Sequence, residues 1–268
     1  MVSIEWIHHL FSSDTQRYPW HPNAVYTPDT RHLDADPLSA YINYLDTHQI
    51  DRAILVHPEP YGDDHSLVLD ALTREPNRFR ATCLLYPKDP DAPRKLADLI
   101  ARESRIVALR FHAHRGKEQY LDSFQNAGVR KLWQQAAELN LMIELHIGPN
   151  YPEQARELIA AYPNTPVIID HLGEPQFGYI PEFSNMLALA ELPNTLMKLS
   201  CYEYIANDGP LYLSAQRFTQ QLAVAFGPER LVWGGTVPAL VAAHLPNYSA
   251  ADHANILGGN LQRLLGWP

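Results

Sequence analysis

The sequence is poor in cysteine, in positive charge and in long apolar runs, and each shortage excludes a class of protein. Its two cysteines, Cys83 and Cys201, form no CxxC pair, so we expect two reduced thiols. Lysine and arginine number 21 against 30 aspartates and glutamates, a net charge of -9 that argues against nucleic acid or an anionic membrane as partner. No segment approaches the roughly 18 apolar residues of a membrane span, and no basic and apolar leader opens the chain. We therefore expect a cytoplasmic protein.

What the chain does contain is a regular alternation of β-rich runs and amphipathic stretches. Apolar residues make up 46% of it, which suits a globular enzyme with a large core. Eight strand candidates with helical segments between them predict a (β/α)8 barrel formed as one domain over residues 1–268. A doubly wound open sheet is the alternative, but its GxGxxG turn is missing. The strand candidates are 2–11, 51–57, 79–86, 106–112, 141–147, 166–170, 195–200 and 230–234, and the helical stretches are 38–47, 66–74, 92–103, 129–139, 153–161, 183–189 and 213–226.

Five of the 13 histidines stand at or just past the end of a different predicted strand. In barrels of this kind the catalytic groups lie at the carboxyl ends of the strands, on the loops that follow. One such histidine would be explained by a hydrogen-bonded loop, but five at one rim favour an active site. They are His9, His57, His112, His146 and His171.

Several sequence segments resemble those of the amidohydrolase superfamily, in its amidohydrolase-2 (amidohydrolase-related) branch. They include YGDDHSLVLDAL at 61–72, LRFH at 109–112, DHLGEP at 170–175, KLSCYEY at 198–204 and FGPERLVWGG at 226–235. Their order and spacing are most similar to the lactone-processing group that includes 2-pyrone-4,6-dicarboxylate lactonase. The resemblance implies a TIM barrel that acts on a small lactone or a related cyclic ester.

The chain departs from that family at two of its usual metal-binding positions. The family's His-x-His pair on the first strand is IEWIHHLF here, which places Ile7 at the first histidine and His9 at the second. The aspartate that ends the family's eighth strand is replaced by Thr236 in WGGTVP. His9, His146 and His171 would still hold zinc or another divalent metal, since three imidazoles leave one position open for water. The competing interpretation, which we favour, is a metal-free site with no cofactor in which the histidines act directly.

The remaining polar groups suggest roles at the site. His171 is the best candidate for the central acid–base or carbonyl-polarising group, with His9 and His146 as further catalytic residues. We expect four residues to contact the substrate, and the arginine among them either holds a substrate carboxylate, because a guanidinium can bind two oxygens, or forms a structural ion pair. They are His57, Tyr61, Arg110 and Tyr204. Tyr204 stands where the dicarboxylate lactonase carries another arginine, which suggests a less acidic substrate.

Two buried charges are also expected in the predicted barrel interior. Glu144 lies two residues before His146 on the same strand face, where it would orient a histidine, bind a cation or require another partner. The resemblance places Lys198 in the polar core of the barrel.

Three hypotheses follow for the function. The first is hydrolysis of a small lactone by water addition. The second is metal-independent lactone isomerisation, because the carboxylate that would activate water is missing. The third is a pseudoenzyme that binds a ligand or a partner. The first two imply a small-molecule substrate, and the sequence does not specify an oligomeric state.

Overall fold

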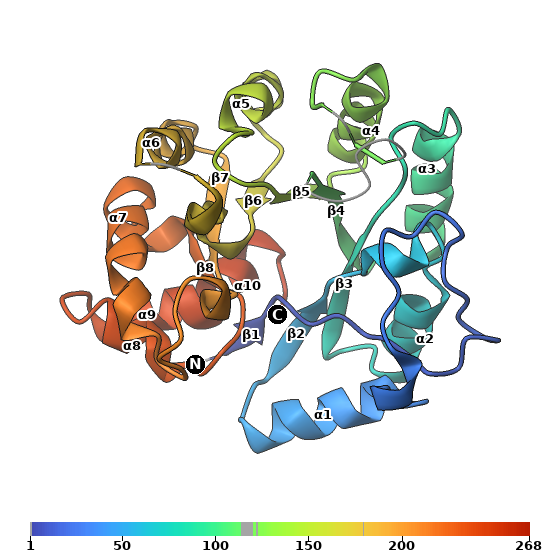
Figure 1. Cartoon of the computed structure of the whole chain (residues 1–268), viewed down its shortest axis with the longest axis horizontal. Helices are drawn as coiled ribbons and strands as arrows, with labels where there is room; N and C mark the ends of the chain where they lie inside the picture. Colours follow the sequence, from blue (N-terminus) through green and yellow to red (C-terminus); the bar gives the residue numbers. More distant parts are fainter. Residues whose placement is uncertain (1, 114–119, 122, 179) are drawn as a thin grey trace. The chain divides into compact units, whose positions relative to one another are not determined.

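A computed structural model describes residues 2–113, 120, 121, 123–178 and 180–268 of the chain, and its strands lie where apolar runs predicted them (Figure 1). The eight strands form one sheet in the order β1 to β8, which is the order of a (β/α)8 barrel. The registers between β2, β3 and β4 and between β6, β7 and β8 are parallel. The strands are β1 (Ile4–Glu5), β2 (Arg52–Leu55), β3 (Phe79–Cys83), β4 (Ile106–His112), β5 (Met142–His146), β6 (Val167–Ile169), β7 (Thr195–Leu199) and β8 (Leu231–Trp233).

Helices occupy the predicted amphipathic stretches. Asp36 caps the first helix through its side chain and Pro37 follows at the first helical position, where its missing N–H costs nothing. In the part of the chain that the structure describes, no helix is long and apolar enough to cross a membrane. The helices are α1 (Pro37–Thr47), α2 (Ser66–Arg74), α3 (Ala92–Arg102), α4 (Ala127–Glu138), α5 (Pro152–Ala161), α6 (Ile180–Ala188), α7 (Gln216–Phe226), α8 (Ala239–His244), α9 (Ala250–Ala254) and α10 (Asn260–Leu264).

The first strand is shorter than predicted. The sequence predicts a strand over residues 2–11, but in the structure only Ile4–Glu5 forms one. The backbone carbonyl of His8 accepts the amide of Val56 at 2.9 Å, and the ring of His9 bonds the Val56 carbonyl at 2.7 Å. The chain is therefore held beyond β1 by one main-chain bond and one side-chain bond, without a continued ladder.

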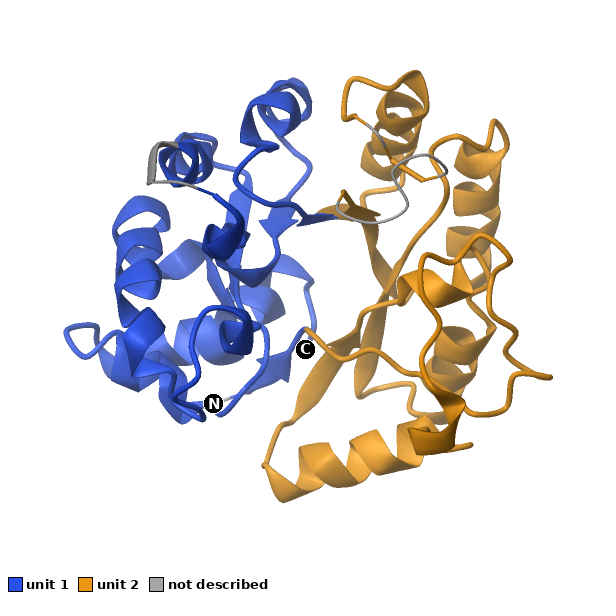
Figure 2. Cartoon of the chain, viewed as in Figure 1, with its two compact units in different colours: residues 1–6, 144–268 blue, residues 7–143 orange. Residues whose placement is uncertain are grey.

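The chain divides into two compact units (Figure 2). Unit 1 combines residues 1–6 with 144–268, and unit 2 is the continuous segment 7–143, so that the boundary falls within β5. The expectation of a single domain stays a prediction.

In unit 1 the C-terminal helices hold the first strand. A π-helical turn, Asn255–Gly259, separates α9 from α10 and packs against β1. Gly258 is required there, because a Cβ at this position would lie 2.2 Å from the carbonyl oxygen of Val2. The buried side chains of Trp6 and Trp233 belong to the core of this unit.

In unit 2 the parallel strands β2, β3 and β4 carry the core, with α1 and α2 beside them. His8 lies flat against Tyr41 of α1, with ring centroids 3.7 Å apart and an angle of 3° between the planes. Burial lowers the pKa of His8 to about 4. His8 is therefore a packing residue.

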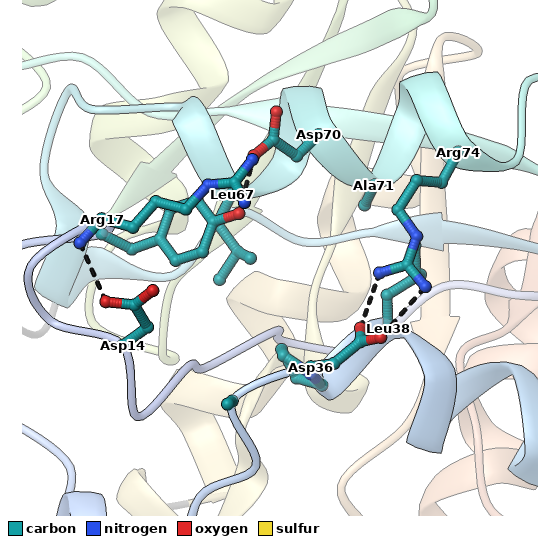
Figure 3. A pocket seen from close by; sticks show the side chains of 11 residues that line it. Asp14, Arg17, Asp36, Leu38, Leu67, Asp70, Ala71 and Arg74 are labelled. Atoms are coloured by element: carbon teal, nitrogen blue, oxygen red, sulfur yellow. Dashed lines mark hydrogen bonds and ion pairs between the residues drawn. The ribbon is translucent and has the colours of Figure 1, made fainter.

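A cavity of about 230 Å³ opens in unit 2 near α1 and α2 (Figure 3). Its charges are matched: Arg17 binds Asp70 at 2.7 Å, and Arg74 binds Asp36 at 2.6 Å. The hydroxyl of Tyr18 donates to Asp70 at 2.6 Å. Because these charged groups satisfy one another near the surface, we assign the cavity to an ion-pair network rather than to a catalytic site.

Candidate active site

Two of the predicted catalytic histidines come together in unit 1, at the ends of two strands. His146 is the last residue of β5, and His171 follows β6 after Asp170. Their ring centroids lie 4.6 Å apart with the planes at 90°. Both side chains are buried, as is that of Asp170.

A left-handed turn brings a third acidic group to this pair. His171, Leu172, Gly173 and Glu174 follow one another with φ of 53°, 58°, 71° and 52°. A left-handed conformation costs a residue other than glycine about 1–3 kcal/mol. Three of these four residues are not glycine, so the turn stores backbone strain of the kind found at functional sites. The turn places Glu174 Oε1 2.8 Å from His146 Nε2, where the ring N–H donates to the carboxylate. This bond orients the imidazole and stabilises its protonated form.

A fully buried ion cluster lies next to the histidines. The ammonium of Lys198, on β7, binds Glu144 of β5 and lies 2.6 Å from Oδ1 of Asp170. The structure therefore supplies the partner that a buried Glu144 was expected to need, and that partner is a lysine. The buried carboxylates of Glu144 and Asp170 thus share this ammonium.

The ring of His171 is held by groups that follow β7. Its Nδ1 lies 2.8 Å from the hydroxyl oxygen of Ser200, and its Nε2 lies 3.9 Å from the sulfur of Cys201. Burial, with the charge of Glu203 as a smaller cause, raises the pKa of the Cys201 thiol, so the sulfur is protonated at neutral pH. Tyr204, which is 54% exposed, presents its ring edge-on at 6.2 Å from His171. The predicted role of Tyr204 in substrate binding stays a prediction.

Thr236 follows β8 in a strained conformation. Its φ is 75°, in the left-handed region that β-branched residues rarely enter, at a cost of about 1–3 kcal/mol. Its hydroxyl oxygen is buried and has no hydrogen-bond partner among the residues that the structure describes. An unsatisfied buried hydroxyl costs a further ~1–3 kcal/mol. Both costs fall on the residue at which the sequence analysis predicts the loss of a carboxylate.

His146, Asp170 and His171 have the donor atoms that a divalent ion requires. Their ligand atoms all lie within 4.8 Å of one another. Asp170 uses Oδ1 for Lys198, and its Oδ2 lies 4.0 Å from His171 Nε2. Two ligands of a tetrahedral zinc ion lie about 3.4 Å apart when each bond is about 2.1 Å, so a small movement would suffice. These residues fit a metal, and the geometry gives no support to the metal-free preference. The sequence analysis did not predict Asp170 as a member of this group.

The predicted residues of unit 2 are held by their own contacts. His57 follows β2 and is fully buried beside His65, with ring centroids 4.2 Å apart. Its Nε2–H donates to the carbonyl of Gly62 at 2.8 Å. Nδ1 therefore carries the lone pair, and it has no hydrogen-bond partner among the described residues. Burial is the main cause that lowers the pKa of His57 well below its usual range, with the charges of His65 and Arg110 adding to it, so the ring is neutral.

His9, Tyr61 and Arg110 also belong to unit 2. The Nδ1–H of His9 donates to Val56, which fixes the tautomer in which Nε2 is the basic nitrogen. The hydroxyl of Tyr61 accepts the amide of Ser12 at 2.9 Å, and burial raises its pKa to about 12. Arg110 is only 2% exposed on β4. Their roles, like that of His112 at the end of the same strand, stay predictions.

Asp170, Glu174 and Ser200 were missed by reasoning from the sequence. The phrase DHLGEP contains two of them, but adjacent residues of a strand point to opposite faces, so nothing grouped Asp170 with His171. The strand ends at Ile169, and the left-handed turn that follows makes the alternation rule inapplicable. The one available signal was the unusual density of ionisable residues after β6.

Comparison with known proteins supplies the family. The sequence model of an amidohydrolase family matches residues 7–267. The chain belongs to the amidohydrolase family. The relatives of this amidohydrolase include the 4-sulfomuconolactone hydrolase of Hydrogenophaga intermedia, 28% identical over 86% of this chain and 72% of the relative.

Solved structures confirm the fold of this amidohydrolase. A probable 2-pyrone-4,6-dicarboxylic acid hydrolase from Acinetobacter baumannii, with citric acid bound, matches with a TM-score of 0.79 and 23% identity over 99% of this chain and 100% of that one. An amidohydrolase from Burkholderia multivorans with bound zinc matches with a TM-score of 0.72 and 18% identity over 100% of both chains. The predicted (β/α)8 barrel and the predicted family are therefore confirmed.

Proposed function

We propose that this amidohydrolase hydrolyses a small lactone, in which water adds to the ring carbonyl and the ring ester bond opens to a hydroxy acid. The observation that carries the proposal is the buried pair of His146 and His171, each ring oriented by a hydrogen bond, beside the Asp170 carboxylate. The family match and the lactone hydrolase among the relatives support this reaction class. The substrate is a small molecule.

The chemistry is divided between the two histidines. His171, with Nδ1 held by Ser200, polarises the lactone carbonyl or exchanges a proton with it through Nε2. His146 shares its Nε2 proton with Glu174, which stabilises the positive charge that the ring acquires when it takes a proton from water. His146 then gives that proton to the ring oxygen that leaves when the ester bond breaks. The ion pair with Lys198 keeps the Asp170 carboxylate fixed beside His171.

A divalent ion would be held by His146, Asp170 and His171. When bound, it would supply Lewis-acid polarisation and a more acidic water. Elemental analysis after dialysis against zinc checks this assignment, with about one zinc per chain expected in the wild type and less in His146→Gln. If neither protein retains zinc, the direct histidine chemistry described above is favoured.

The predicted residues of unit 2 are proposed as substrate contacts, each to be tested separately. His57 offers the lone pair of its buried Nδ1 to a substrate hydroxyl. Arg110 would bind a substrate carboxylate through its guanidinium. Carboxylates are common to citrate, which is bound in one structural neighbour, and to the dicarboxylic acid in that neighbour's name. His9 offers a basic Nε2, and Tyr61 can still donate its hydroxyl proton.

The experiment is a proton-release assay over a panel of lactones, which should include aldonolactones, simple aliphatic lactones and 2-pyrone-4,6-dicarboxylate. We expect the wild type to hydrolyse at least one, and His171→Gln to lower its turnover by about 10²–10⁴-fold, the usual effect of losing a general acid or base. His253→Gln is the matched control, because this histidine lies on α9, where its ring bonds the Leu245 carbonyl at 2.8 Å. Equal activity of the two variants would refute the assignment.

The same assay in ¹⁸O-labelled water separates hydrolysis from isomerisation. Hydrolysis places one solvent oxygen in the product, whereas transfer to an internal hydroxyl leaves solvent oxygen out. Isomerisation stays the second candidate because the sequence analysis predicts Thr236 in place of the carboxylate that would activate water. A wild type that turns over nothing on the panel, but is stabilised by the same lactones, would favour the pseudoenzyme.

A further inference from the structure

Thr236 is unfavourable for stability in two independent ways. A β-branched side chain is held in a left-handed backbone conformation, with φ of 75°, directly after Gly235, whose φ of 137° is also positive. The hydroxyl oxygen is buried, and no group in the described part of the chain hydrogen-bonds it. Valine would have the same shape without the unsatisfied hydroxyl, and asparagine or glycine would adopt the backbone conformation more readily.

The surroundings of Thr236 connect it to the histidine pair within unit 1. Gly234 directly follows β8 and lies so close to β7 that a Cβ there would be 2.6 Å from Cγ of Lys198 and 2.7 Å from Cβ of Ser200, which follows β7. Lys198 binds Asp170, and Ser200 bonds the ring of His171. The end of β8 thus packs on the two residues that hold Asp170 and His171, and Thr236 follows two positions later.

A hydroxyl cannot serve as a base or as a strong metal ligand at neutral pH, so hydrogen bonding is the chemistry left to it. We propose that Thr236 is a substrate-binding residue, whose hydroxyl donates a hydrogen bond to an oxygen of the molecule bound at His171. The proposal rests on the proposed function. It explains why an unsatisfied hydroxyl is kept in a strained position: the partner arrives with the ligand.

The test compares Thr236→Val with Thr236→Ser. Valine keeps the volume and the β-branch and removes only the hydroxyl, whereas serine keeps the hydroxyl. We expect Thr236→Val to be at least as stable as the wild type in urea denaturation, yet to lose about tenfold in kcat/KM on a lactone that the wild type hydrolyses. Thr236→Ser should stay within about threefold of the wild type.

Thermal stabilisation by citrate is a second readout that does not depend on lactone turnover. We expect a smaller citrate-induced rise in Tm in Thr236→Val than in the wild type. If the wild type hydrolyses no lactone but this difference appears, the proposed function fails and the role of Thr236 stands. Lower stability of Thr236→Val would show that the hydroxyl is already bonded in the free protein and would overturn the proposal. Equal behaviour of Thr236→Val and the wild type in both readouts would also overturn it.

Discussion

Replacing Lys198 by methionine should destabilise the protein more than any ordinary single substitution. Its ammonium is fully buried and is shared by Glu144 and Asp170. Methionine keeps most of the chain volume but leaves two carboxylates without their cation. Removing one partner of a buried ion pair costs about 3–5 kcal/mol, and because two carboxylates are affected we expect about 5 kcal/mol. That is a large part of a typical total of about 5–15 kcal/mol.

Urea denaturation at pH 7 measures this loss. Tryptophan fluorescence is a suitable probe, because the Lys198 nitrogen lies 4.8 Å from the centre of the Trp6 ring. Lys131→Met, at an exposed position of α4, is the matched control and should change stability by less than ~0.5 kcal/mol.

A triple variant separates charge from packing. If the loss comes from carboxylates that lack the Lys198 ammonium, combining Lys198→Met with Glu144→Gln and Asp170→Asn should recover much of it, since the two side chains that share this ammonium are then uncharged. A Lys198→Met protein that fails to fold while the triple variant folds would agree with this reasoning. A loss within about 1 kcal/mol of the Lys131→Met control would refute it.

Two further predictions use the other buried groups. Because burial lowers the pKa of His8 to about 4, the unfolded chain, with a pKa near 6.5, takes up the proton first as pH falls. The contribution of neutral His8 to the free energy of unfolding is complete above pH 6.5 and is lost toward pH 4. His8→Phe keeps a ring against Tyr41 but cannot take up a proton. Between pH 6.5 and pH 4 its free energy of unfolding, measured by urea denaturation, should therefore fall by up to about 3 kcal/mol less than that of the wild type. An identical pH dependence of the two proteins would contradict this. Because burial raises the pKa of the Cys201 thiol, iodoacetamide at pH 8 should leave Cys201 unmodified in the native protein and label it in urea, as read by mass spectrometry. Rapid labelling of native Cys201 would instead identify a reactive thiolate.

The strands were the most predictable part of the fold, for a physical reason. A strand of a parallel sheet is buried on both faces, so its sequence is a continuous apolar run, and β2 to β8 each fill most of their predicted ranges. The exception, β1, was predicted too long because the apolar run continues past Glu5. There, one main-chain bond to His8 and one side-chain bond from His9 hold the chain in place of a continued ladder, and residue type alone does not show that.

The candidate site was only partly predictable. His146 and His171, whose rings lie side by side, were both predicted as site residues because catalytic groups of such barrels lie at the carboxyl ends of the strands. Glu144 could be expected to need a partner, but the choice of Lys198 depends on which strands lie side by side. Glu174 reaches His146 only through four consecutive left-handed residues, three of them not glycine, and such a backbone follows from tertiary packing rather than from local preference.

The packing of β1 into unit 1 has a consequence for the order of events during synthesis. Unit 2 is a continuous segment, so all of it has left the ribosome well before the chain is complete. Val2, by contrast, lies against Gly258, which is made 256 residues later. At about 5–20 residues per second, the first strand waits roughly 13–50 s for the turn that holds it. The strand Ile4–Glu5 is therefore made before unit 2 and stays without the turn that packs against it until unit 1 is nearly complete.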